Sequence, residues 1–424
     1  MAQEQDNLAI KDSRTGRSYT VPIENGTIRA MDLRQIKTDP EDFGLMTYDP
    51  AFMNTASCRS TITFIDGDRG ILRYRGYPIE VLAEHCSFLE VAFLLLFGEL
   101  PTESELKSWV LEITHHTMLH ENTKKFMEGF RYDAHPMAML VSTVAALSTI
   151  YPEAREIHDA GNRMLQIKRL IGKTPSIAAM SYRHNAGLPY VYPDNDLSYT
   201  ENFMNMLWKK VEPKYSANPA LAKALDILFI LHADHEQNCS TNAMRSVGSS
   251  QADPFLSTAA AAAALSGPLH GGANEEVIRM LDEIGSKENV PAYVKRVKEG
   301  HGRLMGFGHR VYRTEDPRAT HLRVLSEELG RRTGHEKLFR LSRAMEETVK
   351  AEKGLIANVD FYSASTYYSL GIPVDLFTGV FAVSRMSGWT AHVLEQYKNN
   401  RLIRPRAEYR GNPDGMPWIP LERR

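Results

Sequence analysis

The sequence predicts a mainly α-helical protein with a small β-rich segment at its N-terminus. Up to about residue 75, β-branched and aromatic residues alternate between turn signals such as Glu24-Asn25-Gly26, which is typical of strands. From Pro78 onward, apolar residues recur at helical spacing. No sequence repeat interrupts this pattern, and the low-complexity content is confined to an alanine-rich run at 258–265. These observations favour a helical protein with a β-rich extension.

Composition is that of a globular protein. The 424 residues are enough for two domains, and 43% hydrophobic and 24% charged residues are ordinary for a folded chain. A formal net charge of −2 argues against nucleic-acid and membrane partners, and no apolar run reaches the roughly 20 residues of a membrane span. Three scattered cysteines suit a reducing compartment. Because the first residues are acidic and polar, unlike a secretory or transit peptide, we expect a soluble cytoplasmic protein.

The β-rich segment contains three predicted strands. The first covers residues 18–23 and ends at the Glu24-Asn25-Gly26 turn. The other two, at 60–65 and 71–74, flank Asp66-Gly67-Asp68. An Asp-Gly pair between such residues is a hairpin signal, so a β-hairpin is expected there.

Helices account for most of the remaining chain. Thr102 and Glu105 have the spacing of a capping box, and apolar residues follow them at helical spacing. Asn218-Pro219 predicts another helix start, with proline at the first helical position. The other expected helical segments are 136–151, 160–171, 197–211, 258–265, 274–284, 338–349 and 374–383.

Two histidines continue the apolar stripe of the helix that begins near Pro219. Leu228, His232 and His235 follow Leu221 and Leu225 at steps of three and four residues, so both rings are expected to face the interior. One such histidine is usually a satisfied core residue, but two suggest a polar pocket at the end of a buried helix. A metal site is the alternative, although no third ligand can be assigned and the metalloprotease pattern HExxH is absent.

His270 lies in Gly267-Pro268-Leu269-His270-Gly271-Gly272, between two expected helices. Proline fixes one side of this turn, and the glycines allow the backbone to come close to a ligand. The segment is either a helix connector with an incidental histidine or a site where His270 acts on a ligand.

A second histidine loop, Gly306-Phe307-Gly308-His309, is followed by Arg313 and Arg318. Glycine-rich backbone and two arginines suit an anionic ligand that carries phosphate or carboxylate groups. The dinucleotide fingerprint is excluded, since its third glycine and preceding strand are missing.

Three further charged residues stand out near the C-terminus. Asp360 lies among Val359, Phe361 and Tyr362, where it is either a helix N-cap or a carboxylate whose apolar neighbours tune its pKa for general-base work. Arg385 interrupts an apolar helix, which is costly without an anion or partner carboxylate. Arg404 lies in an arginine-rich segment.

Taken together, these segments resemble citrate synthase over nearly the whole chain. The β-rich N-terminus, with residues 62–68, is similar to the longer bacterial form found in Gram-negative organisms, often hexameric and in some members inhibited by NADH. The matching motifs, in the family's order, are LHADHEQN (231–238), GPLHGGAN (267–274), MGFGHR (305–310), DPRA (316–319), NVDFYS (358–363) and RPR (404–406).

The resemblance implies a citrate (Si)-synthase, an acyltransferase that condenses acetyl-CoA with oxaloacetate and water at the first step of the tricarboxylic acid cycle. By position, Asp360 would remove a methyl proton from acetyl-CoA, His270 would stabilise the enolate, and His309 would protonate the oxaloacetate carbonyl. No metal or other cofactor is implied, since acetyl-CoA is a substrate. Oxaloacetate would be held by His235, Arg318, Arg385 and Arg404, the last from the partner subunit, and coenzyme A by Gly306, Phe307, Gly308 and Arg313.

The same resemblance implies how the chain is organised. A large helical domain (76–278 and 386–424) and a small one (279–385) would follow the β-rich segment (1–75). The minimum assembly would be a homodimer, and a hexamer is open. Tyr151, Arg169 and Lys173 match an allosteric NADH site, whereas His115 and Val211 depart from it, which leaves NADH control open.

Two alternatives remain at this stage. The first is 2-methylcitrate synthase, which would use propionyl-CoA with the same catalytic residues; one methylene changes discrimination by only about 1–3 kcal/mol. Leu269, where alanine is usual, and the unusual 363–366 segment could reshape the acyl pocket. The second is a catalytically silent scaffold on the same fold, against which the complete set of catalytic residues argues.

Overall fold

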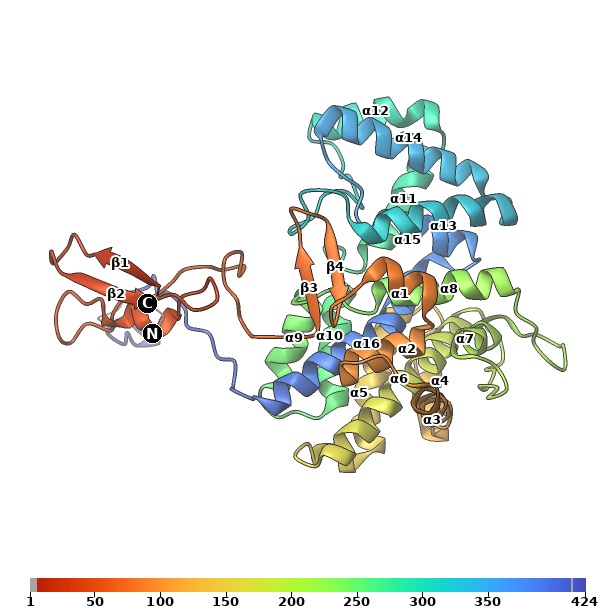
Figure 1. The fold of residues 1–424 in the computed structure, drawn as a ribbon, viewed down its shortest axis with the longest axis horizontal. Coiled ribbons are helices and arrows are strands. Elements are labelled where there is room, and N and C mark those ends of the chain that lie inside the picture. The colour runs from red at the N-terminus through yellow and green to blue at the C-terminus, as the bar shows by residue number, and fades with distance from the viewer. Residues whose placement is uncertain (1–5, 413–414) are drawn as a thin grey trace. The chain divides into compact units, whose positions relative to one another are not determined.

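The computed structural model describes residues 6–412 and 415–424. Its described residues fall into two compact units (Figure 1). The first unit joins the N-terminal part of the chain, up to Ser60, with the residues from Arg404 onward, and the second unit is Thr61–Ile403. Each unit has its own structure.

The first unit is built on an antiparallel strand pair. Strands β1 (Asn7–Lys11) and β2 (Ser18–Pro22) pair with Leu8 opposite Val21. Val21 packs in a small core with Leu33 and Ile36, beside the 3₁₀-helix η1 (Ala30–Gln35). Strand β2 confirms the strand predicted at 18–23, whereas the sequence analysis missed β1.

A three-stranded antiparallel sheet belongs to the second unit. Its order is β3 (Thr63–Asp66), β4 (Ile71–Tyr74) and β5 (Tyr77–Pro78). Thr63 pairs with Tyr74 and Asp66 with Ile71, so the chain turns at Gly67, as the hairpin prediction required. These strands therefore separate from β1 and β2, although one β-rich segment over 1–75 was expected.

Helices make up most of the second unit, which confirms the predicted fold class. Helix α16 (Phe377–Lys398) is buried along most of its length and packs against α2, α6, α8, α9 and α10 (Figure 1). The helices before the His270 turn are α1 (Ile79–His85), α2 (Phe88–Phe97), α3 (Glu103–Thr114), α4 (Glu121–Glu128), α5 (Pro136–Ile150), α6 (Ala160–Asn185), α7 (Tyr199–Trp208), α8 (Pro219–His232), α9 (Cys239–Gly248) and α10 (Pro254–Leu265).

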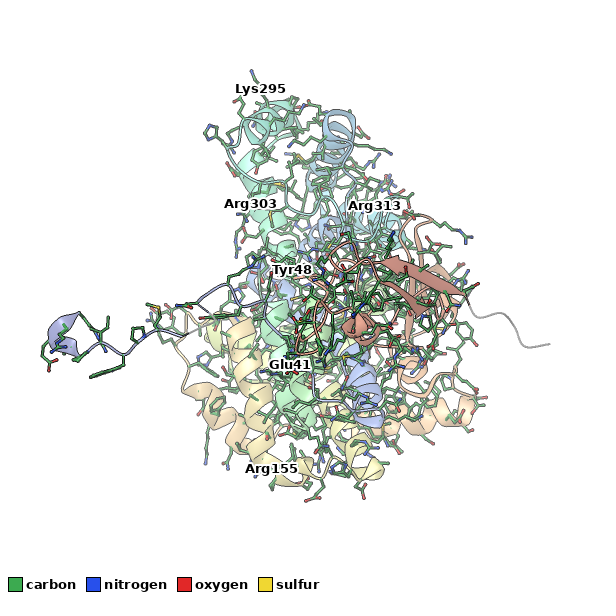
Figure 2. All side chains as sticks on the ribbon, turned by 90° about the vertical axis from the view of Figure 1, so that its left-hand side faces the viewer. Glu41, Tyr48, Arg155, Lys295, Arg303 and Arg313 are labelled. Atoms are coloured by element: carbon green, nitrogen blue, oxygen red, sulfur yellow. The ribbon has the colours of Figure 1, made fainter. Side chains whose placement is uncertain are left out.

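A second group of helices packs mainly among its own members. Helix α15 lies against α11, α13 and α14, and α12 lies against α14. Lys295 on α12 and Arg155, in the 3₁₀-turn before α6, lie at opposite ends of the second unit (Figure 2). The group comprises α11 (Ala273–Ile284), α12 (Val290–Lys298), α13 (Pro317–Thr333), α14 (Glu336–Lys353) and α15 (Val359–Ser369). The domain boundaries expected at 278/279 and 385/386 stay a prediction.

Local sequence signals place several helix starts correctly. Thr102 and Glu105 form the predicted capping box at α3, because each side chain bonds the other's backbone N–H. Asn218 caps α8, whose first residue is Pro219. Among the described residues, no helix is long and apolar enough to cross a membrane.

The prediction that His235 lies on the same helix as His232 is wrong. Helix α8 ends at His232, and the chain then turns through Glu236, whose φ of 52° is left-handed. The Asp234 Oδ2 atom accepts the Glu236 N–H at 3.1 Å, a local bond that competes with further helix. His235 is therefore presented by a turn.

Candidate active site

The His270 turn connects α10 to α11 and depends on its glycine pair. The His270 N–H donates to Gly267 O at 2.9 Å and the Gly272 N–H to Leu265 O at 3.1 Å. A Cβ on Gly271 would lie 2.6 Å from Leu265 Cγ, and one on Gly272 would lie 2.8 Å from Ser266 O. Glycine is needed at both positions because the two chain segments touch there.

Contacts with Ser240 fix the tautomer of His270. Ser240 N–H lies 3.3 Å from His270 Nε2 and donates to it, and Ser240 Oγ is 2.9 Å from the same nitrogen. Trp389 Nε1–H donates to Ser240 Oγ at 3.1 Å. Burial lowers the pKa of His270 to about 4, so the ring is neutral at pH 7. With Nε2 accepting, the ring proton is on Nδ1, the nitrogen that remains for a ligand.

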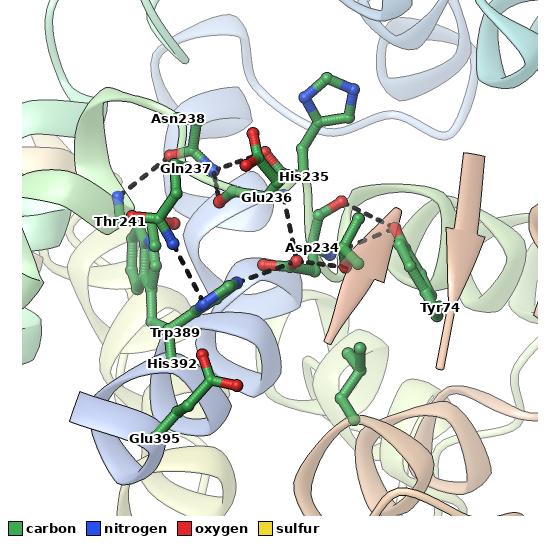
Figure 3. Close-up of polar contacts among 12 residues, drawn as sticks. Tyr74, Asp234, His235, Glu236, Gln237, Asn238, Thr241, Trp389, His392 and Glu395 are labelled. Atoms are coloured by element: carbon green, nitrogen blue, oxygen red, sulfur yellow. Dashed lines mark hydrogen bonds and ion pairs between the residues drawn. The ribbon is translucent and has the colours of Figure 1, made fainter. Parts of the chain in front are cut away.

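A buried network holds the turn that presents His235. Asp234 Oδ2 accepts from Thr63 Oγ1 at 2.5 Å and lies 3.1 Å from His392 Nε2 (Figure 3). The Tyr74 hydroxyl donates to Asp234 O at 2.8 Å and accepts the Asp234 N–H at 3.2 Å. Figure 3 shows the His235 ring pointing away from this network. Because Asp234 and His392 are fully buried, the turn has little freedom to move.

His309 has its tautomer fixed by backbone donors. Its Nδ1 accepts from the N–H groups of Val311 at 3.0 Å and Tyr312 at 3.1 Å. Burial, together with the nearby Arg318 charge, lowers the pKa of His309 to about 4. The neutral ring therefore carries its proton on Nε2.

The loop before His309 is bound to the segment before α15. Gly308 N–H donates to Ile356 O at 2.8 Å, and Asn358 N–H donates to Gly306 O at 2.9 Å. Gly306 has φ of 79°, and a Cβ there would lie 2.9 Å from Phe361 Cβ. The predicted coenzyme residues Gly306, Phe307 and Gly308 are thus held beside the start of α15.

Asp360 lies in the first turn of α15 but is not its N-cap. Asn358 caps the helix, since its Oδ1 accepts the Asp360 N–H at 3.0 Å. Within the described chain, Asp360 Oδ1 is buried and accepts no hydrogen bond. Burial raises the pKa of Asp360 to about 7, although the charges of Arg318 and Arg385 oppose the rise. A carboxylate with one buried oxygen that has no partner, and with a pKa near neutrality, suits a general base.

Two buried arginines carry the positive charge of the site. Arg318 pairs with Asp316 through two bonds, Nε–Oδ1 at 3.0 Å and Nη2–Oδ2 at 2.7 Å. Arg385 Nε–H donates to His232 O at 2.6 Å, and burial lowers the pKa of Arg385 to about 10. Both residues are about 1% exposed; Asp316 neutralises Arg318, whereas Arg385 has no ion pair among the described residues, and its burial is costly unless it meets an anion.

These groups converge on one place. The rings of His235 and His309 are 5.3 Å apart, and His235 Nε2 lies 3.4 Å from the Tyr312 hydroxyl. Burial lowers the pKa of His235 well below its usual range, and the charges of Arg318 and Arg385 add to this effect. His270 also acts electrostatically on His235, and Arg318 and Arg385 act on Asp360. The structure thus brings together His235, His270, His309, Asp360, Arg318 and Arg385.

The other predicted site residues are placed differently. Arg404 is exposed and belongs to the first unit. Arg313, labelled in Figure 2, is exposed, and its backbone N–H donates to Gly67 O at 2.9 Å. Arg169 lies 4.0 Å from the Tyr151 ring and pairs with Glu153, while Lys173 donates to His116 O and Met118 O. Tyr151, Arg169 and Lys173 thus form their own cluster along α6.

Sequence reasoning missed Ser240, Trp389 and Tyr312 as parts of the site. Ser240 lies two residues after the motif 231–238, which was the available signal, whereas Trp389 reaches Ser240 only through the packing of α16. Among the described residues, no group of three or more His, Cys, Asp or Glu side chains is arranged to hold a metal ion.

Comparison with known proteins decides the family. A family model described as citrate synthase, C-terminal domain, matches residues 51–406. The chain belongs to the citrate synthase family. A citrate synthase of Dictyostelium discoideum is 48% identical over 100% of this chain and 85% of its own length. A peroxisomal citrate synthase of the same organism is 49% identical (96% and 86%), and a glyoxysomal one of Cucurbita maxima is 46% identical (95% and 81%).

Solved citrate synthase structures show the same fold. That of Pyrobaculum aerophilum has a TM-score of 0.80 at 38% identity and covers 87% of this chain and 93% of its own. That of Thermoplasma acidophilum, a ternary complex with carboxymethyl coenzyme A and oxaloacetate, has a TM-score of 0.80 at 32% identity, with coverage of 87% and 97%.

The enzyme is therefore a citrate synthase, a transferase that condenses acetyl-CoA with oxaloacetate to citrate. Nothing in these comparisons favours 2-methylcitrate synthase. The expected cytoplasmic location is contradicted, since two of the three relatives are named for the peroxisome and the glyoxysome. Net charge and scattered cysteines could not reveal this, because they suit any reducing compartment equally.

Proposed function

We propose that Asp360 is the base that removes a methyl proton from acetyl-CoA. The observation that carries this role is its buried Oδ1 atom, which no hydrogen bond satisfies, together with a pKa raised to about 7. An ordinary aspartate, with a pKa near 3.8, would be too weak a base. Burial therefore supplies basicity where the reaction needs it.

His270 would stabilise the enolate that this proton transfer creates. A thioester α-proton is only weakly acidic, so the developing oxygen charge needs a preorganised donor. A neutral ring with its proton on Nδ1 can donate to the thioester oxygen without giving up that proton. Ser240 would keep Nε2 occupied and the ring in one orientation.

His309 would act on the other substrate. Its Nε2–H would donate to the carbonyl oxygen of oxaloacetate and protonate it as the new carbon–carbon bond forms. Arg318 and Arg385 would hold the two carboxylates, with His235 fixing the substrate beside them. Arg404 would complete the clamp from a partner subunit. Water would then hydrolyse citryl-CoA in the same site.

Coenzyme A would be held by Arg313 and by the backbone of Gly306, Phe307 and Gly308, which can approach phosphate or adenine closely. Closure of a small domain (279–385) over a large one (76–278 and 386–424) would exclude water and prevent wasteful hydrolysis of acetyl-CoA. The reaction calls for no metal or other cofactor.

The test is release of free CoA thiol from acetyl-CoA and oxaloacetate, run beside propionyl-CoA, on wild type and His270→Ala. Removing the enolate donor should lower kcat by about 10²–10³-fold while the acetyl-CoA preference persists. Wild-type kcat in the His270→Ala variant would refute the role of His270. A preference for propionyl-CoA would move the enzyme to the methylcitrate branch.

The remaining assignments are proposals with separate tests. We propose a homodimer as the minimum assembly. The similarity of the β-rich N-terminus, with residues 62–68, to the longer Gram-negative form supports placing the enzyme in that type, which predicts a hexamer in sedimentation. A role at the entry of the tricarboxylic acid cycle rests on the reaction alone. For location we propose the peroxisome, following the names of two relatives; the enzyme would then share the sequence type of the Gram-negative form but not its bacterial source, and cell fractionation tests the location.

NADH inhibition through Tyr151, Arg169 and Lys173 is the proposed regulation. The cluster is cationic, and burial lowers the pKa of Lys173 to about 8, so an anion would strengthen its charge. Its cations already have protein partners, Glu153 for Arg169 and two carbonyls for Lys173. NADH would have to replace these contacts, so weak inhibition is expected in a titration of activity with NADH.

A further inference from the structure

We propose that the β3–β4 hairpin is a positioning element for the oxaloacetate half of the site. Its base bonds the turn that carries His235, and its tip packs on the loop between His309 and Arg318. The hairpin would thereby set the spacing between these two segments, which are far apart in sequence. The inference rests on the proposed role of His235, His309 and Arg318 in holding oxaloacetate.

At the base of the hairpin, both strands form hydrogen bonds with Asp234. Thr63 on β3 and Tyr74 on β4 are register partners, so their side chains share one end of the sheet. Thr63 bonds the Asp234 carboxylate at 2.5 Å, and Tyr74 bonds both the carbonyl and the N–H of Asp234 (Figure 3). His235 is the next residue, so a shift of these strands would move its ring.

The tip of the hairpin contacts the backbone of the loop between His309 and Arg318. Gly67 O accepts the Arg313 N–H at 2.9 Å, and a Cβ on Gly67 would overlap Val311 O. A Cβ on Gly70 would lie 2.8 Å from Thr314 Oγ1 and 2.9 Å from Glu315 O. Glycine is required at both positions because the two backbones touch.

The contact at Val311 lies beside the residues proposed to bind oxaloacetate. Val311 N–H is one of the two donors that fix His309 Nδ1, and Glu315 leads into Asp316, the ion-pair partner of Arg318. The turn at the tip is closed by Asp66 Oδ1, which accepts the Arg69 N–H at 3.0 Å. A paired hairpin that contacts both segments can fix their distance.

Equilibrium binding of oxaloacetate, measured by titration calorimetry without coenzyme, tests the inference. Gly67→Ala and Gly70→Ala should weaken binding by about tenfold or more, because an added Cβ must push the loop away. Thr63→Val, which keeps the shape of the side chain but removes its bond to Asp234, should weaken binding severalfold. This last variant tests the base of the hairpin even if the glycine variants do not fold.

Two control variants separate positioning from general stability. Asp68→Ala changes an exposed residue at the same tip and should leave binding within twofold of wild type. Gly76→Ala strains a backbone with φ of 92°, yet its Cβ would meet no atom within 4 Å, so it lowers the melting temperature without moving either segment. Gly76→Ala that weakens binding as much as Gly67→Ala would overturn the inference.

Arg318→Gln distinguishes failure of the inference from failure of the proposed function. If this variant binds oxaloacetate as wild type does, the proposed carboxylate clamp is wrong. If it loses binding by about a hundredfold while the folded Gly67, Gly70 and Thr63 variants bind normally, the clamp stands and the hairpin inference fails. Loss of binding in both sets, with the controls unaffected, supports both.

Discussion

Replacing Asp360 with asparagine should abolish most activity and at the same time stabilise the protein. Asparagine keeps the shape of the side chain, and Asp360 Oδ1 has no hydrogen bond to lose. The variant therefore removes the base and little else. General-base catalysis contributes about 10²–10⁴-fold, so kcat for thiol release should fall by that factor.

The gain in stability follows from the pKa of Asp360. The carboxyl group has a pKa of about 7 in the folded enzyme against 3.8 when unperturbed, because burial disfavours its charged form. Between these values the unfolded chain loses the proton first, so the aspartate costs stability as pH rises from about 4 to 7. The full cost above pH 7 is about 4 kcal/mol, as an upper bound, since a tenfold change in equilibrium is worth about 1.4 kcal/mol.

Urea unfolding at pH 5 and pH 8, with thiol release measured on the same preparations, tests this reasoning. The Asp360→Asn variant should exceed wild type in unfolding free energy by more at pH 8 than at pH 5. Asp316→Asn is the matched control, because Asp316 is buried but paired with Arg318, and breaking such a pair costs about 3–5 kcal/mol. An Asp360→Asn variant that is active within tenfold of wild type, or less stable than wild type at pH 8, would refute the argument.

Four other predictions concern Asp360, the surroundings of His270 and the cap of helix α3. Below pH 7, kcat/KM for acetyl-CoA should fall toward tenfold per pH unit as Asp360 becomes protonated, in a pH–rate profile. Ser240→Ala should lower kcat about tenfold, since it removes one hydrogen-bonding group beside His270 Nε2 but keeps the backbone donor; an unchanged kcat would exclude this role. Gly271→Ala should lower kcat about a hundredfold, because its Cβ would press on Leu265 and displace His270; crystals of the variant should show the shift. Thr102→Ala should cost about 1 kcal/mol of unfolding free energy through loss of the α3 cap and leave the kinetics unchanged.

Short sequence signals were enough to predict those elements that are determined by a few neighbouring residues. The capping box at Thr102, the proline after Asn218 and the hairpin turn at Gly67 each need only a few neighbouring residues, and the structure has all three. Prediction from sequence fails where packing against residues far along the chain determines the structure. Helix α6 continues through Pro175 to Asn185, beyond the end expected at residue 171, because buried packing outweighs the cost of an internal proline.

The site was predictable as a set of residue types but not as a geometry. The resemblance to citrate synthase motifs implied that His270, His309 and Asp360 act together, yet it could not show which ring nitrogen carries the proton. That depends on Ser240 and on the backbone of residues 311 and 312, and so on how the chain folds back on itself. The apolar period also placed His235 on a helix, since a periodic pattern gives no signal for a turn made by a side chain such as Asp234.

Three residues of the candidate site break local rules, and this supports a functional role for the site independently of any relative. Asp360 is buried without a partner for one oxygen, Arg385 interrupts a buried helix, and Glu236 has a left-handed backbone. Each is costly alone, and a sequence selected only for stability would avoid all of them. At this site the three features lie beside three neutral histidines, where a bound substrate could offset their cost. The reaction proposed here needs a basic carboxylate at Asp360, and a substrate carboxylate would supply the anion that Arg385 lacks among the described residues.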